Sequence, residues 1–483
     1  MMLWGVPAEV KRFVQPVLRT ASRPIAKAMP AMVLAFLLAP HRRSLKTIAG
    51  SVMGHRVHGA TISRRLVNPH WKTHDWYVGL YEQTWRATDA WERCVAKQRQ
   101  RRWMIVLDAT YHGTMSECME NLILMSKRQD PRRRSTRQHA FLMGLILTDR
   151  GGRIPLPRRS YYTKEYCTKH GRRYRTLNDL AALMLKEAPV PEDVDVTVVF
   201  DSAFDADKIH RVCRRRGFRE VFPIDPNRVL ADSEDEQASG VPGEKVVAWT
   251  RNWEPEEFEL IELQVNNEDL VFFRRRHLDN LRVKKTQRRY AAAARLGAVS
   301  KLGACLIVAS YKENPKVRLL PNQSADWRAY HVPETPSRKR GKKAPARWHG
   351  KVLACTDATA TAREVIQWYE VRWQVELFFR EIKSRLQLGG YVLMKFEAVE
   401  RYVDFLLMGF LLLEHRRLTD MKKTPPSERG GEPWVQARVT DRLRDLDALV
   451  HEWNLHRVEE ALKTQAGRRR LLKELRRSPC RVA

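Results

Sequence analysis

The sequence contains seven cysteines but no Cys-x-x-Cys pair, and they lie at positions 94, 118, 167, 213, 305, 355 and 480. An odd number of scattered cysteines fits neither a zinc site nor a disulfide framework, so we expect reduced thiols and a cytosolic protein. Long hydrophobic runs are also missing. The longest, residues 31–40, is far shorter than the roughly 20 residues of a membrane-spanning helix. We expect a buried helix there, and no signal peptide or internal repeat is visible.

Acidic residues are too few to balance the basic ones. The 483 residues include 88 Lys and Arg but only 56 Asp and Glu, a formal net charge of +32. The hydrophobic content of 43% is ordinary for a globular chain, and the length allows more than one domain. So large a positive excess attracts polyanions, of which nucleic acid is the commonest, and predicts binding that weakens steeply with salt. Charge alone also fits a soluble basic protein or, less well without an apolar segment, a membrane binder.

Residues 1–95 are predicted to be helical, and residues 44–66 form two short helices around a glycine turn in this interpretation. The second helix would bury Ile62 and Leu66. Its outward side chains would be Ser63, Arg64 and Arg65. This pattern resembles a helix-turn-helix, whose second helix enters the major groove of DNA. A plain helical hairpin with a basic exposed face explains the same residues equally well.

From residue 103 onward, short apolar segments predict strands. They cover residues 103–107, 121–125, 141–147, 194–200 and 220–224, with helices at about 177–187 and 203–216. Strands first, then strands alternating with helices, indicate an α/β domain with a mixed sheet. The irregular stretch 227–349 predicts an inserted β-rich subdomain with basic loops, although residues 332–346 also fit a solvated linker.

Residues 361–389 predict one long helix, which begins at a capping box of Thr361 and Glu364 and ends at Gly389. Four polar side chains fall within about 60° of one another on a helical wheel: Tyr369, Arg372, Glu376 and Lys383. Aromatic and aliphatic residues, Trp373 among them, flank this stripe. A separate polar face can simply meet water: Glu370, Gln374, Glu381 and Arg385. Because charges in an apolar groove are costly without a metal, counter-charge or ligand, the flanked stripe indicates function rather than a solvated face.

The spacing Tyr-x2-Arg-x3-Glu-x6-Lys, here ending at Lys383, resembles the signature of a large group of bacterial insertion-sequence transposases. These are DDE enzymes with an RNase H-like core. Asp108 and Asp201, each at the end of a predicted strand, are similar to the two earlier acids of that family. The interval from Asp201 to Glu376 is nearly twice that from Asp108 to Asp201, which resembles members with a β-rich insertion. The resemblance covers roughly residues 100–400.

The resemblance implies an RNase H-like catalytic core, a mixed five-stranded sheet with flanking helices interrupted by the β-rich insertion. The implied division is a helical DNA-binding domain (1–95), the core (96–226 and 350–415), the insertion (227–349) and a C-terminal helical region (416–483). It further implies a homodimer that holds both transposon ends, with an interface sought at about 434–463. The protein would be bacterial, cytoplasmic and associated with the nucleoid.

The implied chemistry is cut-and-paste transposition. The acids Asp108, Asp201 and Glu376 would hold two Mg²⁺ ions, for which Mn²⁺ can substitute, to cut the element ends and join the 3′-hydroxyl to target DNA. The residues expected to contact double-stranded DNA are Tyr369, Arg372 and Lys383, together with Arg64 and Arg65 of the helix-turn-helix.

Two other functions share some of these features. Another RNase H-like endonuclease or resolvase would need the three acids but not the Tyr/Arg/Lys stripe, and a non-catalytic repressor derived from a transposase would need only DNA binding. Asp205 and Asp225, close to Asp201, are interpreted as capping or surface residues. Three tryptophans of the insertion are expected in the core rather than stacked on a flipped base: Trp253, Trp327 and Trp348.

Overall fold

The computed structural model describes the chain outside residues 1–5, 20, 39–58 (where only 45 and 48 are described), 97–100, 115–117, 125–136, 149–151, 233–237, 267–284, 315–323, 332–347, 392, 424–438 and 477–483. The chain divides into two compact units. The first combines Met1–Asp195 with Gln374–Ala483, and the second is the continuous stretch Val196–Trp373.

The first unit contains an antiparallel sheet built around two long strands. β1 (Arg101–Thr114) pairs with β3 (Arg137–Thr148) in an unbroken register. Three short strands also pair with β3: β2 (Ile123–Leu124), β4 (Arg153–Pro155) and β5 (Arg159–Ser160). β3 is buried along almost its whole length, as its apolar run predicts, and so forms the centre of this sheet.

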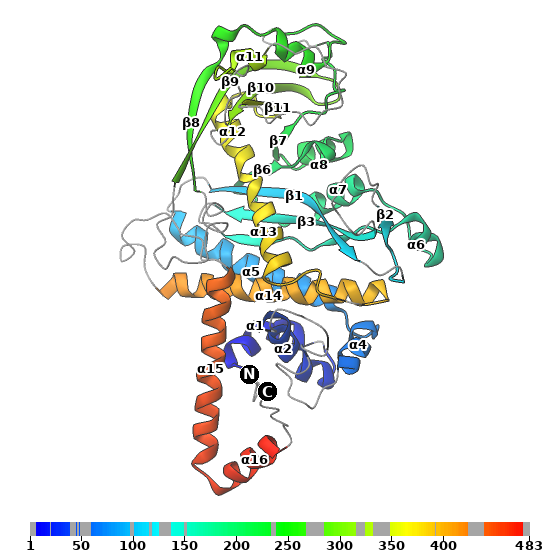
Figure 1. The fold of residues 1–483 in the computed structure, drawn as a ribbon, viewed down its shortest axis with the longest axis vertical. Coiled ribbons are helices and arrows are strands. Elements are labelled where there is room, and N and C mark those ends of the chain that lie inside the picture. Colours follow the sequence, from blue (N-terminus) through cyan, green and yellow to red (C-terminus); the bar gives the residue numbers. More distant parts are fainter. Residues whose placement is uncertain are drawn as a thin grey trace. The chain divides into compact units, whose positions relative to one another are not determined.

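Helices make up the rest of the first unit. They are α1 (Ala8–Leu18), α2 (Arg23–Leu38), α4 (Gly59–Val67), α5 (Thr73–Ala96), α6 (Lys164–Lys169), α7 (Leu177–Glu187), α13 (Trp373–Ser384, whose first residue belongs to the second unit), α14 (Phe396–Lys423), α15 (Val439–Leu462) and α16 (Gln465–Arg476). The long helices α5 and α14 pack side by side along the sheet, and α2 and α4 pack on α14 (Figure 1). The predicted buried helix is confirmed, because Val33, Leu34 and Phe36 of α2 have no exposed surface. Among the described residues no helix is long and apolar enough to span a membrane.

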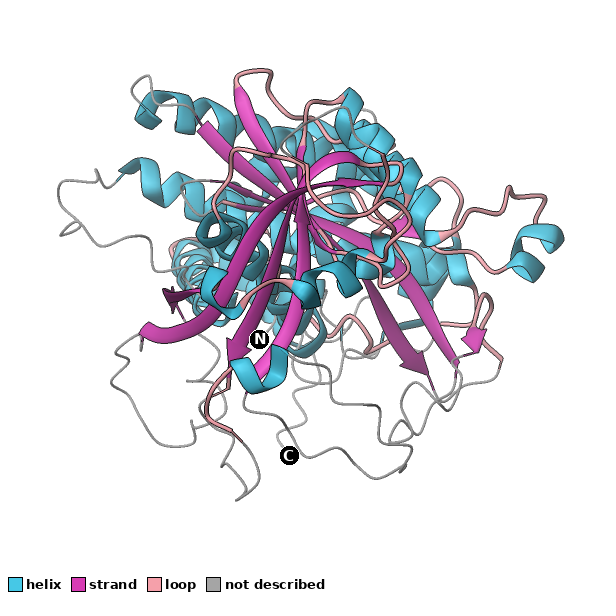
Figure 2. Cartoon of the chain, turned by 90° about the horizontal axis from the view of Figure 1, so that it is seen from above, coloured by secondary structure: helices cyan, strands magenta, loops and turns pink. Residues whose placement is uncertain are grey.

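The second unit is a mixed sheet that carries the predicted insertion. β6 (Val194–Val199) runs parallel to β7 (Arg219–Pro223), and β7 pairs antiparallel with β11 (Trp348–Cys355). β11, β10 (Gly303–Glu313), β9 (Lys285–Val299) and β8 (Glu259–Asn266) then follow as antiparallel neighbours. Its helices include α8 (Asp207–Arg215), α9 (Val246–Trp249), α11 (Arg328–His331) and α12 (Ala362–Val371). Figure 2 shows how strongly the long strands twist.

The predicted mixed α/β class is confirmed, and all five predicted core strands are present. The second of them shrinks to the two residues of β2. Trp253, Trp327 and Trp348 are buried, as expected of core residues. The division into five domains stays a prediction. Most of the first helix of the predicted helix-turn-helix, all of the suggested linker 332–346 and the start of the suggested dimer interface lie outside the described residues.

The single helix predicted for residues 361–389 is wrong, since the structure has two helices there, α12 and α13. The predicted capping box does start α12, where the side chain of Thr361 accepts a hydrogen bond from the Glu364 N–H at 3.2 Å. At Arg372 the backbone N–H bonds the carbonyl of Tyr369, three residues back, at 3.0 Å. This tighter turn ends α12 before α13 begins.

Candidate active site

Asp108 lies in the middle of β1, opposite Met143 of β3. The prediction that a strand ends at Asp108 is wrong, because β1 continues through Thr114 and its later residues find backbone partners on β3. The Asp108 carboxylate is half-buried, and its Oδ1 accepts a hydrogen bond from the N–H of Ala109 at 2.7 Å. The first predicted acid therefore stands on a long paired strand rather than at the start of a loop.

His112, four residues after Asp108, ties β1 to the helix that carries the last predicted acid. Side chains alternate along an unbroken strand, so His112 and Asp108 point to the same face of the sheet. The imidazole hydrogen-bonds the backbone of Gly389, just beyond α13. Burial, together with nearby Lys383 and His139, lowers the pKa of His112 to about 4. The turn after α13 thus packs on the face of β1 that bears Asp108.

Asp201 follows β6 by two positions, as the sequence predicts for an acid at a strand end. It is the N-cap of a short 3₁₀ helix, Ser202–Phe204, and its Oδ1 accepts a hydrogen bond from the N–H of Ser202 at 2.9 Å. Phe204 is buried and fixes this turn to the core of the second unit. Asp201 is therefore held at the end of a parallel strand by its own cap.

A buried charge network lies directly after the Asp201 turn. His210 places Nε2 3.0 Å from Asp205 and Nδ1 2.8 Å from Glu220, and Arg228 donates to Asp205 at 2.7 Å. Burial disfavours the charged forms of both residues. The hydrogen bonds and opposite charges outweigh burial, so the pKa of Asp205 is lowered and the pKa of His210 is raised. Because both ring nitrogens face carboxylates, this arrangement favours the protonated form of His210, which holds the segment after Asp201 in place.

The interpretation of Asp205 as a capping or surface residue is wrong, because its side chain is completely buried (0% exposed). Its partners come from α8 and from the chain after β7, and nothing in their sequence spacing connects them. Asp225 behaves as expected of a turn residue, with Oδ1 accepting a hydrogen bond from the N–H of Asn227 at 2.8 Å.

Glu376 and Lys383 lie on α13 in the first unit. α13 buries Val375, Phe378, Phe379 and Ile382. Glu376 is half-buried, whereas Lys383 is exposed, with its ammonium group 5.7 Å from the centre of the Phe379 ring. Trp373, which the wheel places beside the stripe, is exposed rather than packed. Glu376 and Lys383 therefore lie on a helix that buried apolar side chains hold in place.

Tyr369 and Arg372 lie at the end of α12 in the second unit. The Lys351 ammonium donates to the Tyr369 hydroxyl at 3.0 Å and lies 4.7 Å from the centre of the ring. The Arg372 guanidinium is 5.8 Å from the same ring centre. Two cations therefore sit against the signature tyrosine, and one of them, Lys351 on β11, carried no signal in the sequence.

The expectation that Glu370 meets water is wrong. Its carboxylate is only 14% exposed and accepts from the Lys312 ammonium at 2.7 Å and from the Tyr290 hydroxyl, and it pairs with Arg288. Burial and the cations Arg288 and Lys351 lower the pKa of Lys312, while the Glu370 carboxylate opposes that effect. Two cations, Arg288 and Lys312, share this one carboxylate, which leaves positive charge next to Tyr369.

Glu381 is not a solvated residue either. It forms an ion pair with Arg153 at 3.0 Å, and the Arg153 side chain is only 2% exposed. β4, which carries Arg153, is a three-residue strand that the sequence did not predict. The polar face of α13 thus partners a buried cation.

A comparison with protein families bears on the segment that holds most of these residues. Residues 174–408 match the family described as "Transposase DDE domain". The chain contains a transposase DDE domain. This is a family of enzymes that cleave DNA and transfer its strands, so the domain implies DNA transposition, and the mixed sheets flanked by helices are consistent with it. The chain matches none of the curated protein sequences.

The matched range includes Asp201, Glu376 and the stripe residues of α12 and α13, whereas Asp108 precedes it. Enzymes with a DDE domain generally use divalent metal ions. The donor set of the three acids fits such ions, because Mg²⁺ prefers carboxylate oxygens. Among the described residues no group of three or more His, Cys, Asp or Glu side chains is poised to hold a metal ion. Two of the acids belong to the first unit and one to the second, so neither unit alone holds all three.

The predicted DNA contacts outside the DDE domain lie on α4. Ile62 and Leu66 are buried, as expected, and Arg64 is exposed. Arg65 is only partly outward: its guanidinium lies 5.8 Å from the centre of the Trp71 ring, and burial lowers its pKa. Arg64 is therefore the better placed of the two for a polyanion.

Proposed function

We propose that the chain is a cut-and-paste transposase of a bacterial insertion sequence, of the group with the Tyr-x2-Arg-x3-Glu-x6-Lys signature. The observation that carries this proposal is the position of that signature inside the matched DDE domain, with Asp201 at the end of a parallel strand ahead of it. DNA substrates would be the two element ends and the target duplex. A homodimer would hold both ends together in the bacterial cytoplasm, at the nucleoid.

The carboxylates of Asp108, Asp201 and Glu376 would hold two Mg²⁺ ions, for which Mn²⁺ can substitute. When bound, these ions supply Lewis-acid activation of the attacking and leaving oxygens of a phosphodiester. The fold holds two of these acids in fixed positions. Asp108 is fixed by its strand and Asp201 by its cap, so both carboxylates are oriented before DNA arrives.

The stripe residues would bind the DNA backbone beside the acids. Lys383 is exposed on α13, and Arg372 stands at the last turn of α12, so both can reach phosphate oxygens. Tyr369 would donate its hydroxyl proton to a phosphate, because the Lys351 ammonium already donates to the hydroxyl oxygen. The surplus positive charge of the cluster around Glu370 would strengthen this contact.

The test uses a plasmid that carries the element's own ends, incubated with protein and Mg²⁺. Wild type is compared with Glu376→Gln and with Glu452→Gln, a matched change at an exposed site on α15. We expect double-strand breaks at both ends and strand-transfer products with wild type and Glu452→Gln, and none with Glu376→Gln or after chelation of the metal. Asp108→Asn tests the acid outside the matched range in the same assay.

Other outcomes would assign a different function. Cleavage without strand transfer would indicate an endonuclease or resolvase. Binding of the ends by all variants with cleavage by none would indicate a repressor. Full activity of Glu376→Gln would show that the carboxylate assignment is wrong.

A further inference from the structure

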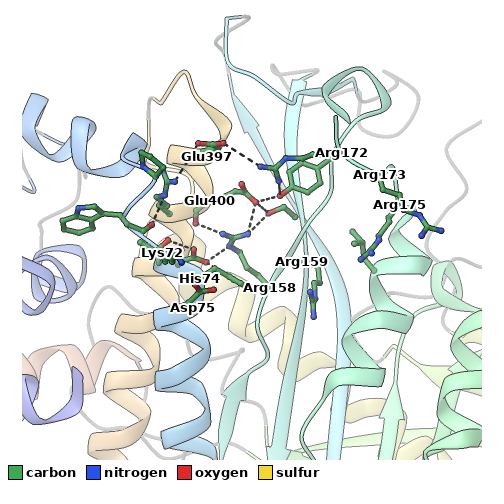
Figure 3. A pocket seen from close by; sticks show the side chains of 18 residues that line it. Lys72, His74, Asp75, Arg158, Arg159, Arg172, Arg173, Arg175, Glu397 and Glu400 are labelled. Carbon is green, nitrogen blue, oxygen red and sulfur yellow. Dashed lines mark hydrogen bonds and ion pairs between the residues drawn. The ribbon is translucent and has the colours of Figure 1, made fainter. Parts of the chain in front are cut away.

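A pocket of about 660 Å³ opens on the first unit between the start of α5, the loop before α7 and the first turns of α14 (Figure 3). Its lining carries six arginines, one lysine and one histidine against four carboxylates. The pocket belongs to none of the elements that bear the predicted catalytic acids. Its excess of basic groups indicates an anionic ligand.

Two cations of this pocket, the buried Arg158 and the exposed Arg172, already have partners within the protein. Arg158 is 5% exposed and pairs with Asp404 at 2.8 Å and with Glu400 at 3.3 Å. Arg172 donates to the Tyr162 hydroxyl at 2.7 Å and lies near Glu397. This inner network is neutralised, so it serves as a rigid floor rather than as a site for a small anion.

Three cations at the rim behave differently. Lys72, Arg173 and Arg175 are exposed, and within the described part of the chain their side chains have neither an ion pair nor a hydrogen bond. In Figure 3 Lys72 lies on one side of the inner network and the two arginines lie on the other. Charges spread across an opening in this way suit a polyanion that lies over the pocket more than a molecule that fills it.

The pocket is also coupled to α4. Arg401 of α14 lines the pocket, and its guanidinium donates to the carbonyl of Leu66, near the end of α4, and to the carbonyl of Trp71 at 3.1 Å. These bonds tie the end of α4 and the chain just before Lys72 to the same helix. Exposed Arg64 on α4 and Lys72 at the rim therefore lie on segments that are anchored to the same helix.

We propose that this pocket is a docking site for the phosphate backbone of a DNA duplex, in which Lys72, Arg173 and Arg175 contact phosphates and set the position of α4 on the duplex. The inference rests on the proposed function only in that the chain binds DNA, and it assigns a site away from the catalytic acids. Phosphate contacts carry no sequence information but fix register and orientation, which a short basic helix such as α4 needs.

The experiment measures duplex binding in the Glu376→Gln background without metal, so that cleavage does not enter. Arg173→Ala/Arg175→Ala is compared with Lys11→Ala/Arg12→Ala, which removes the same charge from exposed positions of α1 outside the pocket. Each lost phosphate contact lowers the slope of log K against log salt by about 0.9. We expect a slope smaller by about 2 and a roughly 10- to 50-fold weaker affinity at about 0.1 M salt for the pocket variant alone. Circular dichroism checks that each variant is folded.

Each outcome is decisive. Equal losses in the two double variants would overturn the docking site and leave only general electrostatic attraction. Saturable binding of inorganic phosphate to wild type, lost in Arg173→Ala/Arg175→Ala, would make the pocket a small-anion site instead. If the Glu376→Gln parent itself fails to bind duplex DNA, the proposed function fails, and that result differs from failure of the pocket alone.

Discussion

The imidazole of His112 occupies the space that a side chain on residue 389 would need. A Cβ atom built on Gly389 would overlap three atoms of the ring, and the same ring hydrogen-bonds the Gly389 backbone. The His112 ring on β1 thereby packs directly against the backbone of the turn that follows α13. The strand carries Asp108 and the helix carries Glu376.

Gly389→Ala is expected to destabilise the protein by about 2 kcal/mol, because the ring must leave its site or the turn must shift. The adjacent Gly390→Ala is the control, since its added carbon would come no closer than 3.3 Å to any neighbour. Urea unfolding measures both. In a double-mutant cycle with His112→Ala, a coupling of at least about 0.5 kcal/mol is expected. Strict additivity would contradict the steric explanation.

His112 should make the fold sensitive to acid. Its pKa is lowered to about 4 by burial and by Lys383 and His139, whereas an unfolded histidine has a pKa of about 6.5. The unfolded state therefore binds the proton first, and stability falls as pH drops from about 6.5 to 4, by at most about 3 kcal/mol. His112→Gln should flatten this part of the stability curve, measured by denaturant unfolding at several pH values. An unchanged curve would mean that His112 is already solvated.

The buried network after Asp201 should respond strongly to the loss of one carboxylate. Asp205→Asn removes the buried counter-charge of Arg228 and one of the two carboxylates that face His210, and it should cost about 3–5 kcal/mol. Asp207→Asn is the matched control, because Asp207 pairs with the same Arg228 but is 36% exposed, so a loss below about 1 kcal/mol is expected. Thermal unfolding compares them. Similar losses in the two variants would show that burial of Asp205 is not what matters.

A substitution of Glu381 tests whether this carboxylate meets water, as expected from the sequence, or stabilises buried Arg153, as the structure indicates. If it only met water, Glu381→Gln would be neutral. Because it neutralises Arg153, which is 2% exposed, we expect a loss of about 2–3 kcal/mol. Glu452→Gln, exposed on α15, serves as the reference and should change stability by less than about 0.5 kcal/mol. A neutral Glu381→Gln would restore the solvated interpretation.

The strands of the core could be predicted because apolar runs at β1, β3, β6 and β7 are strong local signals. The ends of these strands could not be predicted. β1 extends six residues past Asp108 because β3 supplies backbone hydrogen-bond partners, and the local sequence does not show which strand will pair with which. The break at Arg372 is likewise a single tight turn inside a segment that is helical throughout by pattern.

The candidate site shows the same limit. The helical stripe identified Tyr369 and Lys383, but the wheel assigned Glu370 and Glu381 to water. A wheel describes one helix alone, and the partners of these acids come from strands distant in sequence, such as Lys312 on β10 and Arg153 on β4. Lys351 beside Tyr369 escaped notice for the same reason.

The second unit is one uninterrupted stretch, so the polypeptide enters it once and leaves it once. Asp201 lies just after the start of this unit and Glu376 just after its end, so the second unit carries the middle acid of the proposed triad. If Asp201 is a catalytic acid, evolution cannot lose this segment as a whole without losing activity. Any in-frame deletion that removed it cleanly would also remove Asp201, and the shortened gene would encode a protein that retains two acids but not the third.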